Sequence, residues 1–249
     1  MGHCKTRRMT FAAIGTLAVV AGTVRAGTVT LSASADNTLY QDATGSLSNG
    51  QGESFFAGNT ALEELRRGLI RFDFSAIPAG STVTGVTLTL NCTRSISLAE
   101  NVSLHRSLQS WGEGASNALG EGGRGATAEP GDATWVHRFS DTSSWDALGG
   151  DFENTGSATS AVAGIGAYTW SSNDMISDVQ NWVNDASGNH GWFVLGAESV
   201  AGSAKRFASR ENTVLSLRPS LEVTYVIPGP GALGLFAVGA IAAGRRRRR

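Results

Sequence analysis

Cysteine is nearly absent from this sequence, and charged residues are scarce. The 249 residues include 2 Cys, at positions 4 and 92, and only 16% of them are charged. If Cys4 leaves with a cleaved leader, Cys92 has no partner and no disulfide forms within the chain. Between its two ends the chain has no uninterrupted apolar run of the roughly 18 residues that a membrane span needs, which excludes a polytopic membrane protein.

Basic residues are also few in the body of the chain. Residues 27–230 contain 11 Lys and Arg and all 21 Asp and Glu, a net charge of 11 − 21 = −10, while the other basic residues lie near the two ends. A nucleic-acid-binding surface needs clustered Lys and Arg to neutralise phosphates. The acidic body therefore disfavours nucleic acid as a partner.

The motifs of several enzyme classes are missing as well. The sequence has no G-x-S-x-G, no Walker motif, no H-E-x-x-H and no EF-hand spacing. His105, His137 and His190 are widely separated, so no zinc site is expected. A catalytic pair of carboxylates is defined by its separation in space, and a lyase could use His137 or Tyr168 as its base. A glycoside hydrolase or a lyase therefore stays open as an alternative to a non-catalytic protein.

What the sequence does contain is the alternation of β-strands. Hydrophobic residues make up 41% of the chain, enough for a packed core. They alternate with polar residues in four segments, 29–33, 70–74, 86–92 and 221–227, and residues 192–195 form an apolar run typical of a central strand. Because one face of each strand must be buried, we expect two antiparallel sheets packed face to face, with Cys92 as a buried thiol.

One segment has the helical period instead. Its apolar residues recur at steps of three and four: Met175, Ile176, Val179, Trp182 and Val183. Ser171 and Asp174 stand at capping-box spacing before it, and residues 184–189 end it. We expect one short amphipathic helix on an otherwise all-β domain that spans residues 27–226. Within that domain, residues 112–131 are rich in Gly, Ala and Glu without periodicity, which favours a long surface loop.

Residues 1–26 have the layout of a secretory signal peptide. Lys5, Arg7 and Arg8 precede the apolar residues 11–21, and small residues stand at the two positions that a signal peptidase reads before a cut after Ala26. A buried N-terminal helix is the alternative. The pattern predicts export.

Residues 227–249 have a three-part layout of their own. Pro228-Gly229-Pro230 is followed by an apolar stretch, residues 231–244, and by five arginines. The stretch would span roughly 21 Å as a helix, less than a hydrocarbon core of ~30 Å. This layout resembles the PEP-CTERM sorting signals of Gram-negative bacteria, with Gly229 in place of the usual glutamate. The resemblance implies transient membrane insertion, cleavage by an exosortase-like enzyme and delivery to the surface or exterior.

A set of strings spread through the body resembles the bacterial DNRLRE-type domain. They are Asp36-Asn37-Thr38-Leu39-Tyr40, Ser48-Asn49-Gly50, Leu69-Ile70-Arg71-Phe72-Asp73-Phe74, Ile77-Pro78-Ala79-Gly80, Asp132-Ala133-Thr134-Trp135, Gly149-Gly150-Asp151-Phe152, Gly191-Trp192, Arg206-Phe207-Ala208-Ser209-Arg210-Glu211 and Arg218-Pro219-Ser220-Leu221-Glu222-Val223. The resemblance implies a jelly-roll β-sandwich of secreted bacterial proteins, often found beside polysaccharide-degrading domains. Some similar modules are classed as carbohydrate-binding with a link to alginate, which implies glycan binding here.

Three tryptophans flank the long loop and are candidates for a sugar-binding platform: Trp111, Trp135 and Trp145. Sugar rings present apolar C–H faces on which an exposed indole stacks. Burial in the core is the alternative for each of them.

Charged residues in the strings above suggest an ion network. Arg71 and Asp73 belong to the outer face of one strand, and Arg206, Arg210 and Glu211 follow another. We expect these five residues to form paired charges that fix strand register. The alternative is a clamp for an acidic sugar.

Acidic and amide side chains in turn-like segments are candidate calcium ligands. They are Asp36, Asn37 and Asp132, with Asp42 and Asp151 in similar contexts. Calcium prefers such oxygen ligands, whereas solvated turn residues are the alternative.

The sequence as a whole thus predicts an exported, non-catalytic jelly-roll-like β-sandwich. We expect it to bind extracellular polysaccharide or to contribute to the surface matrix of a Gram-negative-type bacterium. A small polysaccharide-active enzyme and a structural surface protein without a small ligand are the alternatives.

Overall fold

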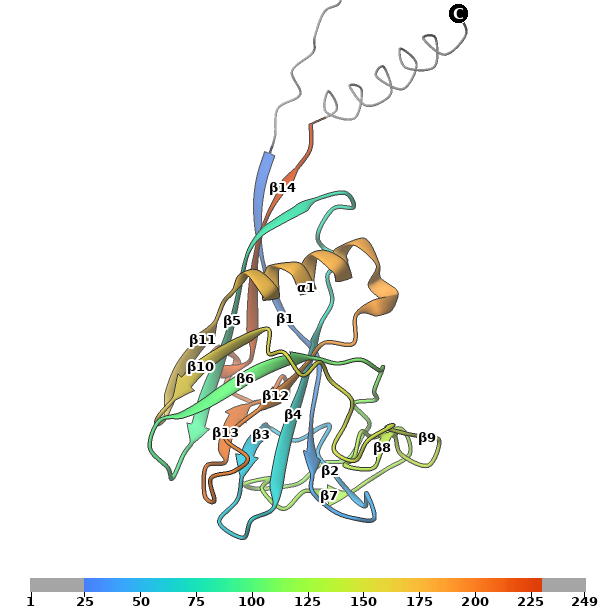
Figure 1. Ribbon diagram of the computed structural model, residues 1–249, viewed down its shortest axis with the longest axis vertical. Helices are drawn as coiled ribbons and strands as arrows, with labels where there is room; N and C mark the ends of the chain where they lie inside the picture. The colour runs from blue at the N-terminus through green and yellow to red at the C-terminus, as the bar shows by residue number, and fades with distance from the viewer. Residues whose placement is uncertain (1–24, 230–249) are drawn as a thin grey trace, which may run out of the picture. The chain divides into compact units, whose positions relative to one another are not determined.

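The computed structural model describes residues 25–229, and 42% of these residues are in strands and 9% in helices (Figure 1). The strands are β1 (Arg25–Tyr40), β2 (Leu47–Ser48), β3 (Ser54–Asn59), β4 (Leu65–Phe72), β5 (Thr82–Arg94), β6 (Glu100–Arg106), β7 (Ala126–Thr127), β8 (His137–Phe139), β9 (Ser143–Ser144), β10 (Ala158–Val162), β11 (Gly166–Trp170), β12 (Trp192–Leu195), β13 (Lys205–Ala208) and β14 (Ser220–Ile227). The helical segments are α1 (Asn173–Asn184), η1 (Ala186–Gly188) and η2 (Leu215–Leu217). The predicted all-β sandwich with one short helix is confirmed.

Ten strands form one sheet that folds back on itself. Their order is β1-β14-β5-β13-β3-β4-β12-β6-β10, and β11 pairs with β5. Two strands take part in both layers. β3 pairs with β13 through residues 54–57 and with β4 through residues 58–59, and β1 neighbours β14 and also pairs with β4. The two layers therefore share a continuous hydrogen-bonded edge, and the main core lies between them.

The predicted alternation is confirmed in the strands of both layers. In β5, Val86, Leu88, Leu90 and Cys92 are buried. Their apolar side chains belong to one cluster with Ile70 and Phe72 of β4 and with Trp192 and Val194 of β12, among others. Burying such side chains is the main favourable contribution to folding, because it removes apolar surface from water. Cys92 is a buried free thiol, as predicted.

A second, smaller core covers the other face of β4 and β12. Leu69 and Phe193 alternate with the residues that face the main core, and the segment after β6 folds over them. β12 is thus buried on both faces, between β4 and β6. This explains its uninterrupted apolar sequence and confirms the predicted central strand.

Helix α1 lies against β5 in the main core (Figure 1). Its cap is Ser172, whose side chain accepts a hydrogen bond from the Met175 N–H. The capping box predicted from Ser171 was therefore wrong by one residue. Trp182 on its buried face contacts Trp192 edge-on, with ring centroids 4.6 Å apart.

Gly27, near the start of β1, and Val226, near the end of β14, lie at the same end of the sandwich. A Cβ atom on Gly27 in β1 would lie 2.8 Å from the Tyr225 ring of β14, and Val226 pairs with Thr82 at the start of β5. The 13 residues of β5 span roughly 40 Å at about 3.3 Å per residue. Arg94, the last residue of β5, is therefore near the opposite end (Figure 1).

The predicted terminal segments fall mostly outside the described residues. Of the signal peptide and the sorting segment, only residues 25–26 and 227–229 are described. Within residues 25–229, no helix is both long enough and apolar enough to cross a membrane.

Candidate functional site

The predicted tryptophan platform is not present on the surface. Trp111, Trp135 and Trp145 are 1%, 6% and 6% exposed and belong to the smaller core. The indole N–H of Trp111 donates to the His190 carbonyl at 2.8 Å, and that of Trp145 donates to the Thr134 carbonyl at 2.9 Å. These indoles have no free face for a sugar, so the platform prediction was wrong. They are needed as core because the segments after β6 must cover the outer face of β4 and β12.

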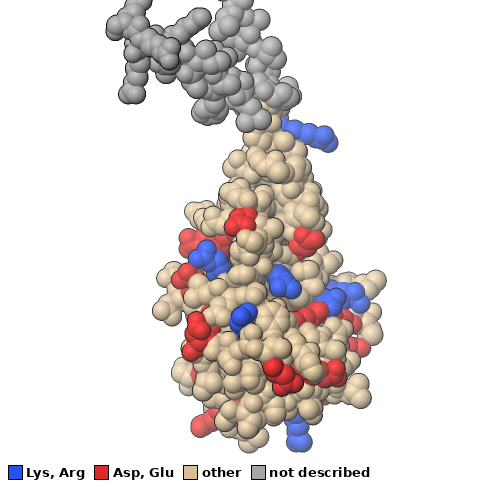
Figure 2. All heavy atoms as spheres, turned by 90° about the vertical axis from the view of Figure 1, so that its right-hand side faces the viewer, with Lys and Arg blue, Asp and Glu red and all other residues tan. Residues whose placement is uncertain are grey.

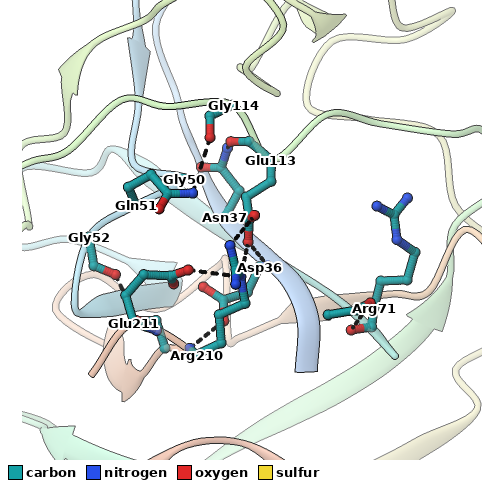
Figure 3. A network of polar contacts seen from close by, with 12 residues as sticks. Asp36, Asn37, Gly50, Gln51, Gly52, Arg71, Glu113, Gly114, Arg210 and Glu211 are labelled. Carbon is teal, nitrogen blue, oxygen red and sulfur yellow. Dashed lines mark hydrogen bonds and ion pairs between the residues drawn. The ribbon is translucent and has the colours of Figure 1, made fainter. Parts of the chain in front are cut away.

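A cluster of three carboxylates, one buried and two partly buried, lies where β1 meets the long loop and the segment after β13 (Figure 3). One oxygen from each of Asp36, Glu113 and Glu211 lies within 4.8 Å of the others. Arg210 lies among them. Its guanidinium donates to both oxygens of Glu113, at 2.6 and 2.5 Å, and its backbone N–H donates to Asp36 at 2.7 Å. Arg210 thus connects the segment after β13 to β1 and to the long loop, which are distant from it in the sequence.

Glu211 is the least satisfied member of this cluster. Its Oε1 lies 2.8 Å from the Nε of Arg210, yet that N–H points at Glu113. Both oxygens of Glu211 are buried without a hydrogen-bond partner among the described residues. Burial raises the pKa of Glu211 to about 7 and raises the pKa of Asp36 well above its usual value. Protonation of Glu211 near neutral pH lowers the negative charge that the cluster must hold away from water.

The predicted calcium ligands are not brought together. Asp36 joins the cluster above. The amide oxygen of Asn37 accepts from the backbone N–H groups of Thr38 and Asn49, and Asp132 accepts from the backbone N–H of Glu129. Their carboxylate and amide groups hold loops in place, so the predicted trio is corrected to Asp36 alone.

The cluster of Asp36, Glu113 and Glu211 offers oxygen ligands of the type that calcium prefers. Arg210 already neutralises part of its charge. Calcium binding therefore stays a prediction, and melting in calcium and in EDTA tests it: a midpoint that does not differ would contradict it. Asp42 and Asp151, the other turn carboxylates, accept from neighbouring backbone N–H groups.

The predicted five-residue ion network divides into separate contacts. Arg210 and Glu211 form the pair described above, and Arg206 pairs instead with Glu121. Asp73 follows the last residue of β4 and accepts two hydrogen bonds from Ser75. The Arg71 guanidinium stacks 5.1 Å from the centre of the Trp111 ring and points away from the carboxylates in Figure 3.

A second site, on the outer face of β3, β13 and β5, was not predicted. Arg206 pairs across the sheet with Phe56 on one side and with Arg94 on the other. A β-bulge at Thr93 shifts the register between β5 and β13, since Phe207 pairs with Cys92 and Arg206 already pairs with Arg94. Bulges redirect side chains. Simple alternation would put Arg94 on the same face as Cys92, but its guanidinium reaches the same carboxylate as Arg206.

That carboxylate belongs to Glu121, in the long loop. Its Oε2 accepts from the Arg94 Nη1 at 3.0 Å and from the Arg206 Nη1. Arg206 is held in place by its Nε, which donates to the Thr93 hydroxyl at 2.9 Å. Glu121 and Arg94 are 68% and 59% exposed, whereas Arg206 is 18% exposed. Two arginines on neighbouring strands thus converge on one anion at the surface.

These residues line an open pocket of about 190 Å³, which we call the arginine pocket. Its charged and apolar walls are Arg66, Arg94, Arg206, Glu121, Phe56 and Ile96. The pocket combines an anion site with the apolar side chains of Phe56 and Ile96, of which Ile96 is 70% exposed. The sequence contains one signal for this site: Arg206 precedes the apolar Phe207 in a strand and is therefore expected to face outward. Nothing in the sequence indicates that Arg94 and Glu121 lie beside it.

No protein-family model matches the chain, and no curated protein matches it. The DNRLRE-type resemblance and the roles that it implies therefore stay predictions. What the protein binds must be inferred from the chemistry of its own residues.

Proposed function

We propose that this protein is an exported, non-catalytic β-sandwich that binds an acidic extracellular polysaccharide through the arginine pocket. The observation that carries the proposal is the convergence of Arg94 and Arg206 on one carboxylate at the surface. Guanidinium groups bind carboxylates through charge-assisted hydrogen bonds, which are about twice as strong as those between neutral groups. The carboxylate of a uronic acid unit is the same chemical group as the one that they hold in the free protein.

The rest of the pocket suits one unit of a chain more than an enclosed small molecule. Its volume of about 190 Å³ is below the ~300–1,000 Å³ of typical ligand pockets, and it is open to solvent. Ile96 offers an apolar contact for the C–H face of a sugar ring. An open site of this size lets the polymer continue on both sides of the bound unit.

The charge of the body supports local recognition of an acidic polymer. On the face shown in Figure 2, acidic and basic side chains are scattered among uncharged ones. With a net charge of −10 over residues 27–230, the body repels polyanions at long range. Capture of an acidic chain therefore depends on the arginine pocket and not on general attraction, which also supports the expectation that nucleic acid is not a partner.

Binding without catalysis is favoured because Glu121 is the one carboxylate among the described residues that line the pocket. Glycoside hydrolysis commonly uses two carboxylates that flank the scissile bond. Export, with removal of the leader by a signal peptidase, and release or anchoring by an exosortase-like enzyme remain part of the proposal and rest on the sequence of the two ends.

Affinity electrophoresis of the purified full chain tests the proposal. Gels that contain alginate or polygalacturonate should retard the protein, whereas a gel with neutral β-glucan should not. Arg94→Gln, at an exposed position, should weaken binding about tenfold, the effect of losing roughly 1.4 kcal/mol. Arg106→Gln on β6 changes the charge equally and serves as the control, because it pairs with Glu153 and does not line the pocket.

The outcomes separate the alternatives. Equal retardation by neutral and acidic polymers, or an Arg94→Gln variant that binds as the wild type does, would contradict the proposed site. Release of reducing ends or unsaturated products would identify the enzyme alternative. No retardation in any gel by a folded protein would favour the structural surface protein.

A further inference from the structure

We propose that Glu121 is a built-in competitor for the ligand: its carboxylate fills the anion site between Arg94 and Arg206, and an acidic sugar binds by taking its place. The inference rests on the proposed function and adds the residue that controls access to the arginine pocket. It follows from the contacts of Glu121, from the way its loop is anchored, and from its exposure.

The strand register creates a need for an anion at this point. Arg94 and Arg206 are directly paired across β5 and β13. Like charges on directly opposed positions of a sheet destabilise it. Glu121 is the one carboxylate that forms ion pairs with these two arginines within the described chain. The carboxylate of a ligand in the same position would pair with both arginines equally well. Displacement of Glu121 from the site therefore loses little free energy once a ligand is bound.

The loop that carries Glu121 is held by other residues. On one side, the Ala118 N–H donates to Asn49 at 2.7 Å, and on the other, the Tyr40 hydroxyl donates to the Gly122 carbonyl at 2.7 Å. Arg66 also reaches the Gly123 carbonyl, at 3.4 Å. Within the described chain, no backbone hydrogen bond holds residues 119–121 between these anchors. Rotation of the Glu121 side chain alone can therefore vacate the anion site while the loop stays in place.

Glu121 is well placed to leave and return. Its side chain is 68% exposed, and exposed ion pairs are weak because water and salt screen them. The charge of Arg206, followed by the hydrogen bond from Arg94, lowers the pKa of Glu121, so the side chain is ionised and competes across the neutral range. The ligand must bind in competition with an attached carboxylate, which reduces its apparent affinity.

Isothermal titration of the purified full chain with a tetrasaccharide of uronic acids tests the inference. Glu121→Gln keeps the shape of the side chain and removes its charge, and it should bind the tetrasaccharide about three- to tenfold more tightly than the wild type. Glu129→Gln is the matched control, since Glu129 is an exposed residue of the same loop with an unpaired side chain in the described structure. It should change the affinity less than twofold.

Each other result has a definite meaning. Wild type and Glu121→Gln of equal affinity would overturn the competitor role and leave the proposed function standing. Weaker binding by Glu121→Gln would make Glu121 a partner of the ligand, and equal gains in both variants would show a general charge effect; either overturns the inference. No binding by any of the three proteins would overturn the proposed function, and the inference with it, whereas binding by Glu121→Gln alone would support both.

A second measurement follows Glu121 itself. In the free protein, the carboxyl ¹³C signal of Glu121 should titrate with a pKa below the usual value of a glutamate. At saturating tetrasaccharide, this pKa should return toward the usual value, because the arginines then hold the ligand. An unchanged titration in a protein that binds the tetrasaccharide would show that Glu121 is not displaced.

Discussion

The buried carboxylate of Asp178 on α1 accepts a hydrogen bond from the indole N–H of Trp192 on β12, at 2.8 Å. The same oxygen accepts from the Ser157 hydroxyl at 2.6 Å. One carboxylate therefore fixes the helix to the central strand and to the segment before β10.

Asp178→Ala should destabilise the protein strongly. It would leave a buried indole N–H and a buried hydroxyl without an acceptor, and each unsatisfied group costs about 1–3 kcal/mol. We expect a loss of about 3 kcal/mol in the free energy of unfolding, measured by chemical denaturation. Asp174→Ala, at an exposed position on the same helix, should cost less than about 1 kcal/mol. Similar losses in the two variants would contradict the role of Asp178.

Trp135→Ala should act on stability as a core substitution. The indole is buried, and the Arg67 guanidinium lies 4.8 Å from its ring centre. Large-to-small changes of this kind cost about 3–5 kcal/mol because they leave a cavity. Thermal melting should show a large decrease in Tm, whereas Leu148→Ala, at an exposed position nearby in the chain, should melt almost as the wild type does. A variant that melts normally but loses polysaccharide binding would restore the platform hypothesis.

The stability of the protein should fall as the pH rises from about 4.5 to 7. Burial raises the pKa of Glu211 from 4.5 to about 7, so in this window the folded protein binds more protons than the unfolded chain. The stabilising contribution is complete below pH 4.5 and is lost as the pH passes about 7. The raised pKa of Asp36 acts in the same direction. We expect a loss of roughly 2 kcal/mol from Glu211, because partial solvent access reduces the full effect.

Glu211→Gln isolates this contribution. The amide mimics the protonated acid, so the variant should lose less stability than the wild type between pH 5 and pH 8, as measured by denaturation at both values. Glu222→Gln, on an exposed position of β14, should keep the wild-type dependence. The opposite slope, with stability rising over this range, would show that Glu211 is ionised and paired in the folded state.

Lys205 should stabilise two hairpin ends at once. Its side chain is buried, and its ammonium group shares its three N–H donors among four acceptors at 2.7–3.0 Å, the hydroxyls of Ser95 and Ser97 and the carbonyls of Leu98 and Ala163. Lys205→Met keeps the length of the side chain and removes all its donors. We expect a loss of about 2 kcal/mol and faster proteolysis within residues 95–99. Arg124→Met, at an exposed position, is the control. Unchanged proteolysis would show that these turns do not depend on Lys205.

The strands and the helix could be predicted because their signals are local. The alternation of residues 86–92 reports directly which side chains face the core, and Trp182 and Val179 mark one helical face. The two-layer arrangement follows because each strand has one apolar face to cover. The cap at Ser172 was missed because two adjacent serines offer the same chemistry and only the backbone conformation distinguishes them.

The candidate sites depend on contacts that a sequence does not report. Asp36, Glu113 and Glu211 are far apart in the chain, and only the course of the long loop brings them together. Arg94 and Arg206 meet through a bulge, which breaks the alternation from which a prediction would start. A tryptophan side chain is usually buried, whereas the position of these three beside the long loop favoured exposure. They are buried because the outer face of β4 and β12 is covered by a second core.

The shared position of Gly27 and Tyr225, at the end of β5 away from Arg94, has a practical consequence. A biosensor chip or a fused reporter coupled at Gly27 or Val226 would sit on the side of the sandwich remote from the arginine pocket. Either coupling would leave the pocket facing the bulk solution, so measurements with the two attachment points should give the same affinity. A loss of signal specific to one attachment would place the glycan contact near the coupled residue.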